Sequence, residues 1–223
     1  ITFASTVLKQ IDLRGVVVSG DAMFDRRTLS LKVREAHGDS LWIVKDNEKG
    51  LYQDIELLFQ PHRKRAGTSA PPMDFRGATS IEKGHGRVDK RSIVVSSLLA
   101  DYSDWPGLEQ VFKLERQSTN ALGTTEVQVR YGITSLPAYL ADPKRLLALS
   151  RDHGGIENGL HHRRDVTMQE DHAQLRMDHA PEMLTILNNI VLGLFARQRE
   201  TNVAQARRDF AYHLDKALTR LIA

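Results

Sequence analysis

The sequence predicts an α/β protein in which a β-rich insertion separates an N-terminal βαβ unit from C-terminal helices. Three observations lead to this fold class. Buried-strand patterns alternate with a helical pattern in residues 1–60, a period of two dominates later in residues 61–136, and a period of 3.6 returns in residues 137–223. We therefore expect the first part of a core, then a basic loop with a β-rich insertion, then the completion of the core with C-terminal helices.

The first part contains a buried strand that stops at an acidic residue. Gly15 precedes the run Val16-Val17-Val18-Ser19-Gly20-Asp21, whose continuous β-branched residues are typical of a strand buried on both faces. A helical pattern over residues 26–36 leads to a second such run, Leu41-Trp42-Ile43-Val44-Lys45. We expect a parallel pair of strands, followed by an amphipathic helix over residues 51–59. Asp21 would then lie at the C-terminal end of a strand.

The insertion begins with a basic segment. Residues 61–92 contain eight Lys and Arg against three Asp and Glu, a local excess of five where the whole chain has a net charge of +3. We expect a loop there, followed by strands near residues 93–95, 111–115 and 125–131, the last with strict alternation. The insertion should therefore be an antiparallel β-rich module with a basic face.

The third part returns to helices. Leu146, Leu149, Ile156 and Leu160 form one stripe of a helix expected from residue 144 to about residue 164. His153, Glu157 and His161 are four residues apart and share a face beside that stripe, with Arg164 three residues further on. Pro181 should open an apolar helix that reaches Phe195, and Thr201 should cap a final helix.

Composition excludes several classes of protein. The chain has no cysteine, which excludes disulfides, thiolate zinc sites and cysteine nucleophiles and agrees with a cytoplasmic location. The longest apolar stretch, residues 183–195, is too short to span a membrane and is interrupted by two asparagines. The first residues lack an initiator Met and the layout of a signal peptide, so we expect the chain to begin inside a longer reading frame.

Asp21 and Glu157 are candidate metal ligands, although each has an ordinary alternative. A carboxylate at a strand end and another on a helix face are hard oxygen ligands of the kind that Mg²⁺ prefers. An Asp after Gly at a strand end is, however, more often a turn or cap residue, and a helical Glu is more often solvated. A zinc site at His153 and His161 is disfavoured because the spacing is not that of a His-Glu-x-x-His motif.

Six segments, taken in order, resemble the H-repeat-associated group of insertion-sequence DDE transposases. They are Gly15-Val16-Val17-Val18-Ser19-Gly20-Asp21-Ala22, Leu41-Trp42-Ile43-Val44-Lys45-Asp46-Asn47, Leu51-Tyr52-Gln53-Asp54-Ile55-Glu56, His85-Gly86-Arg87-Val88-Asp89-Lys90-Arg91, Tyr131-Gly132-Ile133-Thr134-Ser135-Leu136 and Gly155-Ile156-Glu157-Asn158-Gly159-Leu160-His161. The resemblance implies a ribonuclease-H-like fold interrupted by a β-rich insertion.

The resemblance also implies roles for individual residues. Asp21 matches the second Asp of the catalytic triad and Glu157 matches its Glu, and both would bind Mg²⁺ (or Mn²⁺). The first Asp has no match, which leads us to expect an N-terminally truncated protein. Gly154 stands where the group usually has Trp, and Asp89 stands where Glu is more usual. The expected DNA-binding residues are basic or lie beside the catalytic helix: Lys45, Arg63, Lys64, Arg65, Arg87, Arg91, His161 and Arg164.

These roles predict a transposase that cleaves and transfers DNA strands at the ends of an insertion sequence. The expected partners are double-stranded DNA, as transposon ends and target, and a second copy of the chain. The expected location is the bacterial cytoplasm, in association with the nucleoid when the protein is bound to DNA. Two alternatives remain, an inactive DNA-binding remnant of a transposase and a metal-dependent nuclease that uses the same carboxylates for host purposes.

Overall fold

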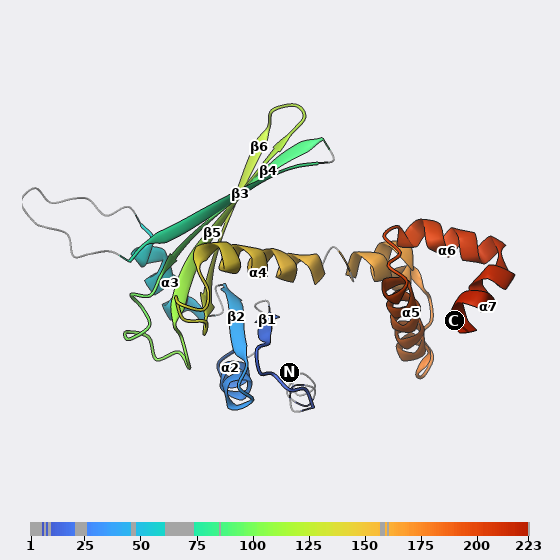
Figure 1. Ribbon diagram of the computed structural model, residues 1–223, viewed down its shortest axis with the longest axis horizontal. Coiled ribbons are helices and arrows are strands. Elements are labelled where there is room, and N and C mark those ends of the chain that lie inside the picture. The colour runs from blue at the N-terminus through green and yellow to red at the C-terminus, as the bar shows by residue number, and fades with distance from the viewer. Residues whose placement is uncertain are drawn as a thin grey trace, which may run out of the picture. The chain divides into compact units, whose positions relative to one another are not determined.

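A computed structural model describes residues 6, 8, 10–20, 26–45, 48–60, 74–84, 86–156, 159 and 161–222 (Figure 1). The chain forms two compact units, one within residues 1–153 and the other within residues 154–223. A mixed β-sheet organises the first unit, whereas the described elements of the second unit are all helical.

The sheet of the first unit has six strands. They are β1 (Val17–Gly20), β2 (Asp39–Val44), β3 (Arg76–Gly84), β4 (Arg87–Ser96), β5 (Gln110–Asn120) and β6 (Thr125–Thr134). Their order is β1-β2-β6-β5-β4-β3, with β1 and β2 parallel and every other pair antiparallel. The expected α/β class and the parallel β1–β2 pair are therefore confirmed.

Helices cover both faces of this sheet. On one face, α2 (Arg26–Glu35) and α3 (Lys49–Leu58) contribute Leu29, Leu51 and Ile55 to a core around Trp42. On the other face, α4 (Pro143–Ile156) contributes buried leucines that pack against a second cluster, which includes Phe112. Burial on both faces explains the uninterrupted apolar run in β2.

Two local features follow directly from backbone geometry. After α2 the chain reverses at His37, whose φ of 59° is left-handed, and Gly38 then leads into β2. At Gly132 in β6 a Cβ atom would lie only 2.2 Å from Cζ of Phe112. Only glycine permits this close approach, so Phe112 can fill the core directly against the strand.

The four antiparallel strands β3–β6, here called the ribbon, continue past the ends of β1 and β2. Strand β2 ends where Val44 pairs with Tyr131, whereas β6 begins six residues earlier at Thr125. The expected strands near residues 93–95, 111–115 and 125–131 are confirmed, and they are longer than the apolar runs indicated. They extend the sheet of β1 and β2 instead of forming a separate one.

The expected loop up to Ser92 is wrong for residues 76–92, which form β3 and the first half of β4. Strand β3 does alternate in burial, but the residues that alternate are small or polar, including Ala78, Ser80 and Glu82. Without a run of apolar residues, the period of two is not visible in the sequence. Pairing with β4 across nine registered positions makes this segment a strand.

The second unit contains a π-helical turn (η3, Arg163–Thr167), a 3₁₀ turn (η4, Glu170–His172), and the helices α5 (Ala180–Arg197), α6 (Val203–Tyr212) and α7 (Leu214–Ile222). Leu192, Phe195, Val203 and Ala206 form its core.

The apolar helix after Pro181 is confirmed as α5, whereas two expectations about the C-terminus are wrong. Asn202, not Thr201, caps α6, because its side chain accepts a hydrogen bond from the backbone N–H of Gln205 at 3.1 Å. The expected final helix is two helices, α6 and α7, which are separated at His213.

Other expectations about the fold stay predictions. The division into residues 1–60, 61–136 and 137–223, and the ribonuclease-H-like topology, belong to this group. Within the part of the chain that the structure describes, no helix is both long enough and apolar enough to cross a membrane.

Candidate nucleic-acid interface

The two candidate metal ligands lie outside the described residues, as do Arg63, Lys64 and Arg65. Whether Asp21 and Glu157 can reach one ion is therefore still a prediction. Among the residues that the structure does describe, no group of three or more metal-ligating side chains occurs.

The segments that lead to the two candidate carboxylates do meet within the first unit. Nδ1 of His153, near the end of α4, lies 3.1 Å from Oγ of Ser19 near the end of β1. Ser19 precedes Asp21 by two residues, and His153 precedes Glu157 by four. This contact fastens α4 to the strand that was expected to deliver the Asp21 carboxylate.

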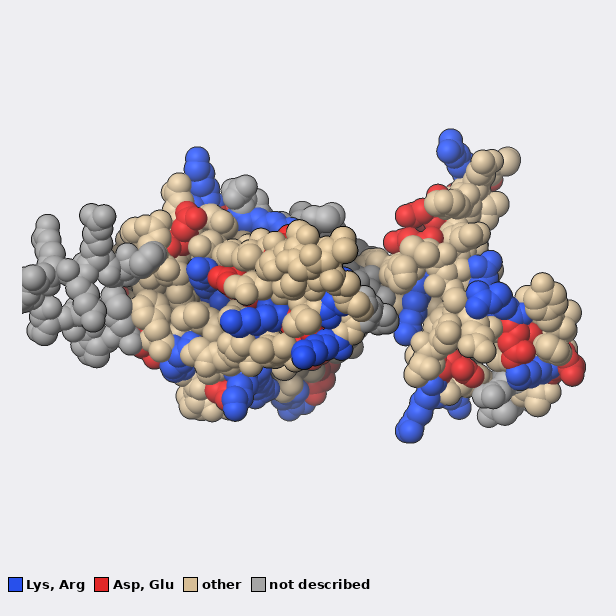
Figure 2. All heavy atoms as spheres, turned by 90° about the horizontal axis from the view of Figure 1, so that it is seen from above, with Lys and Arg blue, Asp and Glu red and all other residues tan. Residues whose placement is uncertain are grey.

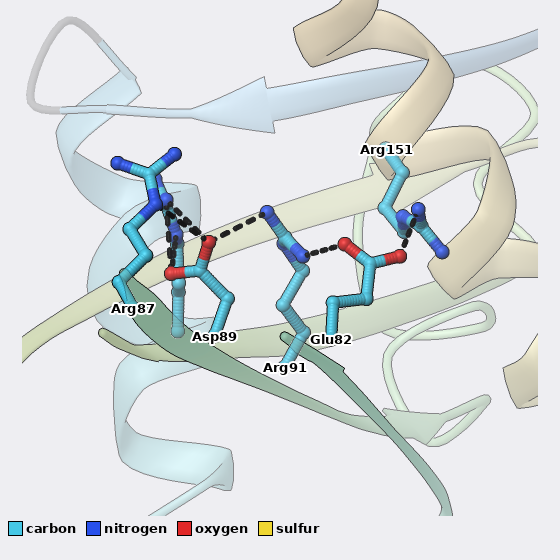
Figure 3. Close-up of polar contacts among 6 residues, drawn as sticks. Glu82, Arg87, Asp89, Arg91 and Arg151 are labelled. Carbon is cyan, nitrogen blue, oxygen red and sulfur yellow. Dashed lines mark hydrogen bonds and ion pairs between the residues drawn. The ribbon is translucent and has the colours of Figure 1, made fainter. Parts of the chain in front are cut away.

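The ribbon carries a network of arginines and carboxylates centred on Asp89 (Figure 3). The Asp89 side chain is only 9% exposed, and it contacts Arg116 at 3.1 Å, Arg87 at 3.4 Å and Arg91 at 3.8 Å. Arg87, Asp89 and Arg91 alternate along β4, so their side chains leave the same face of the sheet. A single buried carboxylate thus holds three guanidinium groups.

A second carboxylate connects this network to α4. Glu82 in β3 accepts a hydrogen bond from Arg91 at 2.9 Å and also forms an ion pair with Arg151 of α4 (Figure 3). Glu82 and Asp89 are paired across β3 and β4, which places both carboxylates on the face that α4 covers. The network therefore runs from β5, through β4 and β3, to the helix that precedes Glu157.

The charge state of Asp89 follows from its partners. Burial alone would raise the pKa of this carboxyl group, but hydrogen bonds from Ser118 and Arg116 and the charges of Arg116 and Arg87 outweigh burial and lower the pKa. Asp89 is therefore ionised at neutral pH. Its interactions stabilise the folded state above the carboxyl group's ordinary pKa of 3.8, and this stabilisation is lost as the pH falls through the lowered value.

We expect Asp89→Asn to destabilise the first unit by about 1–3 kcal/mol, because three guanidinium groups would lose a buried charged partner. Urea denaturation at pH 7 measures this change. Asp101→Asn, which removes the same charge from an exposed position in the same unit, should change stability by less than about 0.5 kcal/mol. Equal effects of the two substitutions would contradict a special role for Asp89.

Not all of the expected DNA-binding residues are equally available to a ligand. The side chain of Arg87 is 52% exposed, whereas that of Arg91 is 20% exposed and contacts two carboxylates. In the second unit, the Arg164 side chain is 22% exposed and forms an ion pair with Glu170. Lys45 and His161 are exposed. The structure thus gives Arg91 and Arg164 structural partners within the protein.

Charge is mixed on the surface of the first unit. In the view of Figure 2, Lys and Arg are interspersed with Asp and Glu on that unit, and no single basic patch covers the face that is visible. The network around Asp89 gives one reason, because carboxylates accompany the arginines there. The basic face expected of the insertion stays a prediction.

Comparison with known proteins assigns the chain to a family. Residues 1–194 match the family described as "Transposase DDE domain". The chain belongs to the DDE transposase family. This match confirms the resemblance to insertion-sequence transposases, and it spans both Asp21 and Glu157.

Relatives of this chain occur in Escherichia coli and Xanthobacter autotrophicus. It is 28% identical over 206 residues to the "H repeat-associated putative transposase YhhI" of Escherichia coli (strain K12), covering 89% of this chain and 52% of that protein. It is 29% identical, with the same coverage, to the "Putative protein YbfL" of the same strain. An "Uncharacterized protein in dhlA 3'region" of Xanthobacter autotrophicus is 33% identical over 147 residues, or 64% of this chain and 46% of that protein. The chain spans about half the length of these curated relatives, and no solved structure matches it.

Reasoning from the sequence missed four members of the charge network. Glu82, Asp89, Arg116 and Arg151 were not predicted as site residues. The one available signal was the spacing of Arg87, Asp89 and Arg91, which places three charges on one face of a strand. Their partners on β3, β5 and α4 depend on strand register and helix docking.

Proposed function

We propose that this chain is the DNA-binding and catalytic part of an insertion-sequence transposase, which cleaves DNA at the ends of the element and joins the freed 3′-hydroxyl to a target. The observation that carries the proposal is the family match over residues 1–194, which includes both predicted carboxylates. DNA is then both substrate and partner. A protein acting in this way would work on the DNA of the bacterial nucleoid.

Asp21 and Glu157 are the proposed catalytic and metal-binding residues. Carboxylate oxygens are the ligands that Mg²⁺ and Mn²⁺ prefer, and bound ions of this kind would activate the attacking hydroxyl and stabilise the leaving oxygen at the phosphorus. The contact between Ser19 and His153 supports the pairing, because it joins β1 to α4 shortly before each carboxylate. The role of these two residues is to hold the ions and so align the scissile phosphodiester.

The first Asp of the DDE triad has no match in this sequence. We propose that a residue outside the matched motifs supplies this carboxylate. The ribonuclease-H-like fold belongs to the same proposal, as does a second copy of the protein at the paired ends of an element. The parallel β1–β2 pair and the docking of α4 on the sheet are compatible with such a fold.

An inactive DNA-binding remnant is the alternative, and one feature of α4 favours it. Gly154 and Gly155 occupy its last turn, three and two residues before the candidate Glu157, and Gly154 stands where the family resemblance leads us to expect Trp. Each glycine costs a helix about 1 kcal/mol relative to Ala. A weakened helix end would hold the carboxylate less firmly.

The first test is the affinity of the chain for duplex DNA as a function of salt. Lys and Arg that neutralise phosphates release condensed counterions, so the affinity should fall linearly on a log–log plot with a slope of about −0.9 for each contact. Fluorescence anisotropy with a labelled duplex measures this slope. Absence of binding at low salt, or binding that salt does not weaken, would overturn the proposed function.

A second arm of the test distinguishes an enzyme from a remnant. A hybrid in which this chain replaces the matching 206-residue segment of the H repeat-associated relative would supply the other parts of a transposase. We expect this hybrid to nick plasmid DNA in Mg²⁺ or Mn²⁺ and to be inactive in EDTA. A hybrid that binds DNA yet never nicks it would favour the remnant.

A further inference from the structure

We propose that Arg87 and Arg116, held in place by Asp89, form a binding site for the phosphodiester backbone of duplex DNA on the α4 face of the ribbon. The inference rests on the proposed function, because it names the residues through which the protein binds DNA beside its candidate catalytic helix. It adds Arg116 to the expected contacts, removes Arg91 from them, and gives Asp89 a positioning role.

The geometry of the arginines suits an anion. Asp89 contacts Nε of Arg87 and both Nε and Nη2 of Arg116, so one carboxylate fixes the direction of two guanidinium planes. A guanidinium group has five N–H donors, and donors therefore remain on both arginines after these contacts. Preorganised guanidinium groups lose less entropy when they bind a phosphate, and they can bind it in a bidentate manner.

A small hollow lies beside the two guanidinium groups. Arg87, Arg116, Ser118, Glu126 and Gln128 line it, and its volume is about 120 Å³. Gln128 donates a hydrogen bond to Glu126 at 3.0 Å. This contact keeps the acidic group of the hollow hydrogen-bonded, while the terminal nitrogens of the half-exposed Arg87 side chain point away from Asp89 (Figure 3).

Strand register puts this hollow on the same side of the sheet as the candidate catalytic helix. Asp89 pairs with Ser118, and through the intervening strands its face is continuous with the face that bears Ser19, which contacts His153 of α4. The ribbon also extends beyond the C-terminal ends of β1 and β2, the ends at which Asp21 follows. DNA aligned at the candidate catalytic residues would therefore cross the arginines of the ribbon.

Arg91 has a structural role in this network, unlike Arg87 and Arg116. Its guanidinium group lies between Asp89 and Glu82, and Glu82 in turn pairs with Arg151 of α4. With two carboxylate partners and only 20% of its side chain exposed, Arg91 joins the network to α4 and contributes little charge to a ligand. This separates Arg91 from Arg87, although the two are only four residues apart on one strand.

The test compares salt slopes for duplex binding by the whole chain and four variants. We expect Arg87→Ala and Arg116→Ala each to lower the magnitude of the log–log slope by about 0.9, and the double variant by about 1.8. Lys90→Ala is the matched control, because Lys90 is exposed, carries the same charge and lies on the same strand but on the opposite face. It should leave the slope unchanged. Circular dichroism shows whether each variant folds. If Arg116→Ala unfolds, the test rests on Arg87→Ala alone, because Asp89 still contacts Arg91 and Arg116 in the Arg87→Ala variant.

Each other outcome overturns the inference in a recognisable way. If both arginine variants have the wild-type slope, the proposed site is wrong. The proposed function would stand, because the chain would still bind DNA. A loss with Lys90→Ala equal to that with Arg87→Ala would show that charge alone matters. Displacement of DNA by inorganic phosphate, at an ionic strength where chloride has no effect, would show that the hollow takes a free phosphate. Failure of the wild-type chain to bind DNA would remove both the inference and the proposed function.

Discussion

Glu157→Gln should reduce metal-dependent nicking by the hybrid transposase more than about a hundredfold, while its affinity for DNA stays within about twofold. Substitutions of groups that merely support a metal ligand already cost 10–100-fold, so loss of a direct ligand should cost at least as much. The amide of Gln is a much weaker ligand than a carboxylate, yet the substitution removes only one negative charge. Plasmid nicking and anisotropy on the same preparation measure the two effects.

The matched control is Asp152→Asn in the same hybrid. Asp152 is an exposed carboxylate on α4, five residues before Glu157, and its loss changes the net charge by the same amount. Nicking should be unaffected. Asp21→Asn should behave as Glu157→Gln does, because both residues are proposed to hold the same ions. Nicking that survives in Glu157→Gln would refute the carboxylate assignment.

Glu170→Gln should destabilise the second unit by on the order of 3 kcal/mol at pH 7. The Glu170 side chain is 12% exposed and accepts hydrogen bonds from Arg164, from Thr185 at 2.7 Å and from Asn188 at 2.9 Å. The hydrogen bond from Arg164 is the largest of the effects that lower its pKa, from 4.5 to about 2. At about 1.4 kcal/mol per pH unit, this difference corresponds to roughly 3 kcal/mol.

The dependence on pH provides a second measurement of the same interaction. Because the folded-state pKa of Glu170 is lowered, its stabilisation is complete above 4.5 and is lost as the pH falls from there towards 2. The difference in stability between wild type and Glu170→Gln should therefore shrink markedly between pH 7 and pH 3 in urea denaturation. Glu182→Gln, at a side chain that is 75% exposed on α5, should show neither effect. A constant difference at both pH values would contradict this account.

Part of the fold could be predicted because it depends on local patterns. The β-branched run before Asp21 and the apolar run of β2 are each typical of buried strands, and a helix between them favours a parallel pair. The strict alternation in residues 125–131 predicted β6, because a period of two is also a local pattern. Strand β3 could not be predicted, because only its registered partner β4 identifies that segment as a strand.

The candidate site divides in the same way. The sequence by itself determined the α/β class, the parallel β1–β2 pair and, through resemblance, Asp21 and Glu157 as candidate ligands, because these depend on residues close together in the chain. Only the tertiary structure decided which arginines are engaged within the protein. Arg116 meets Asp89 through the register of β4 and β5, and Arg151 meets Glu82 through the docking of α4. Ion pairs between distant segments depend on that register and docking, because a charge in the sequence does not specify its partner.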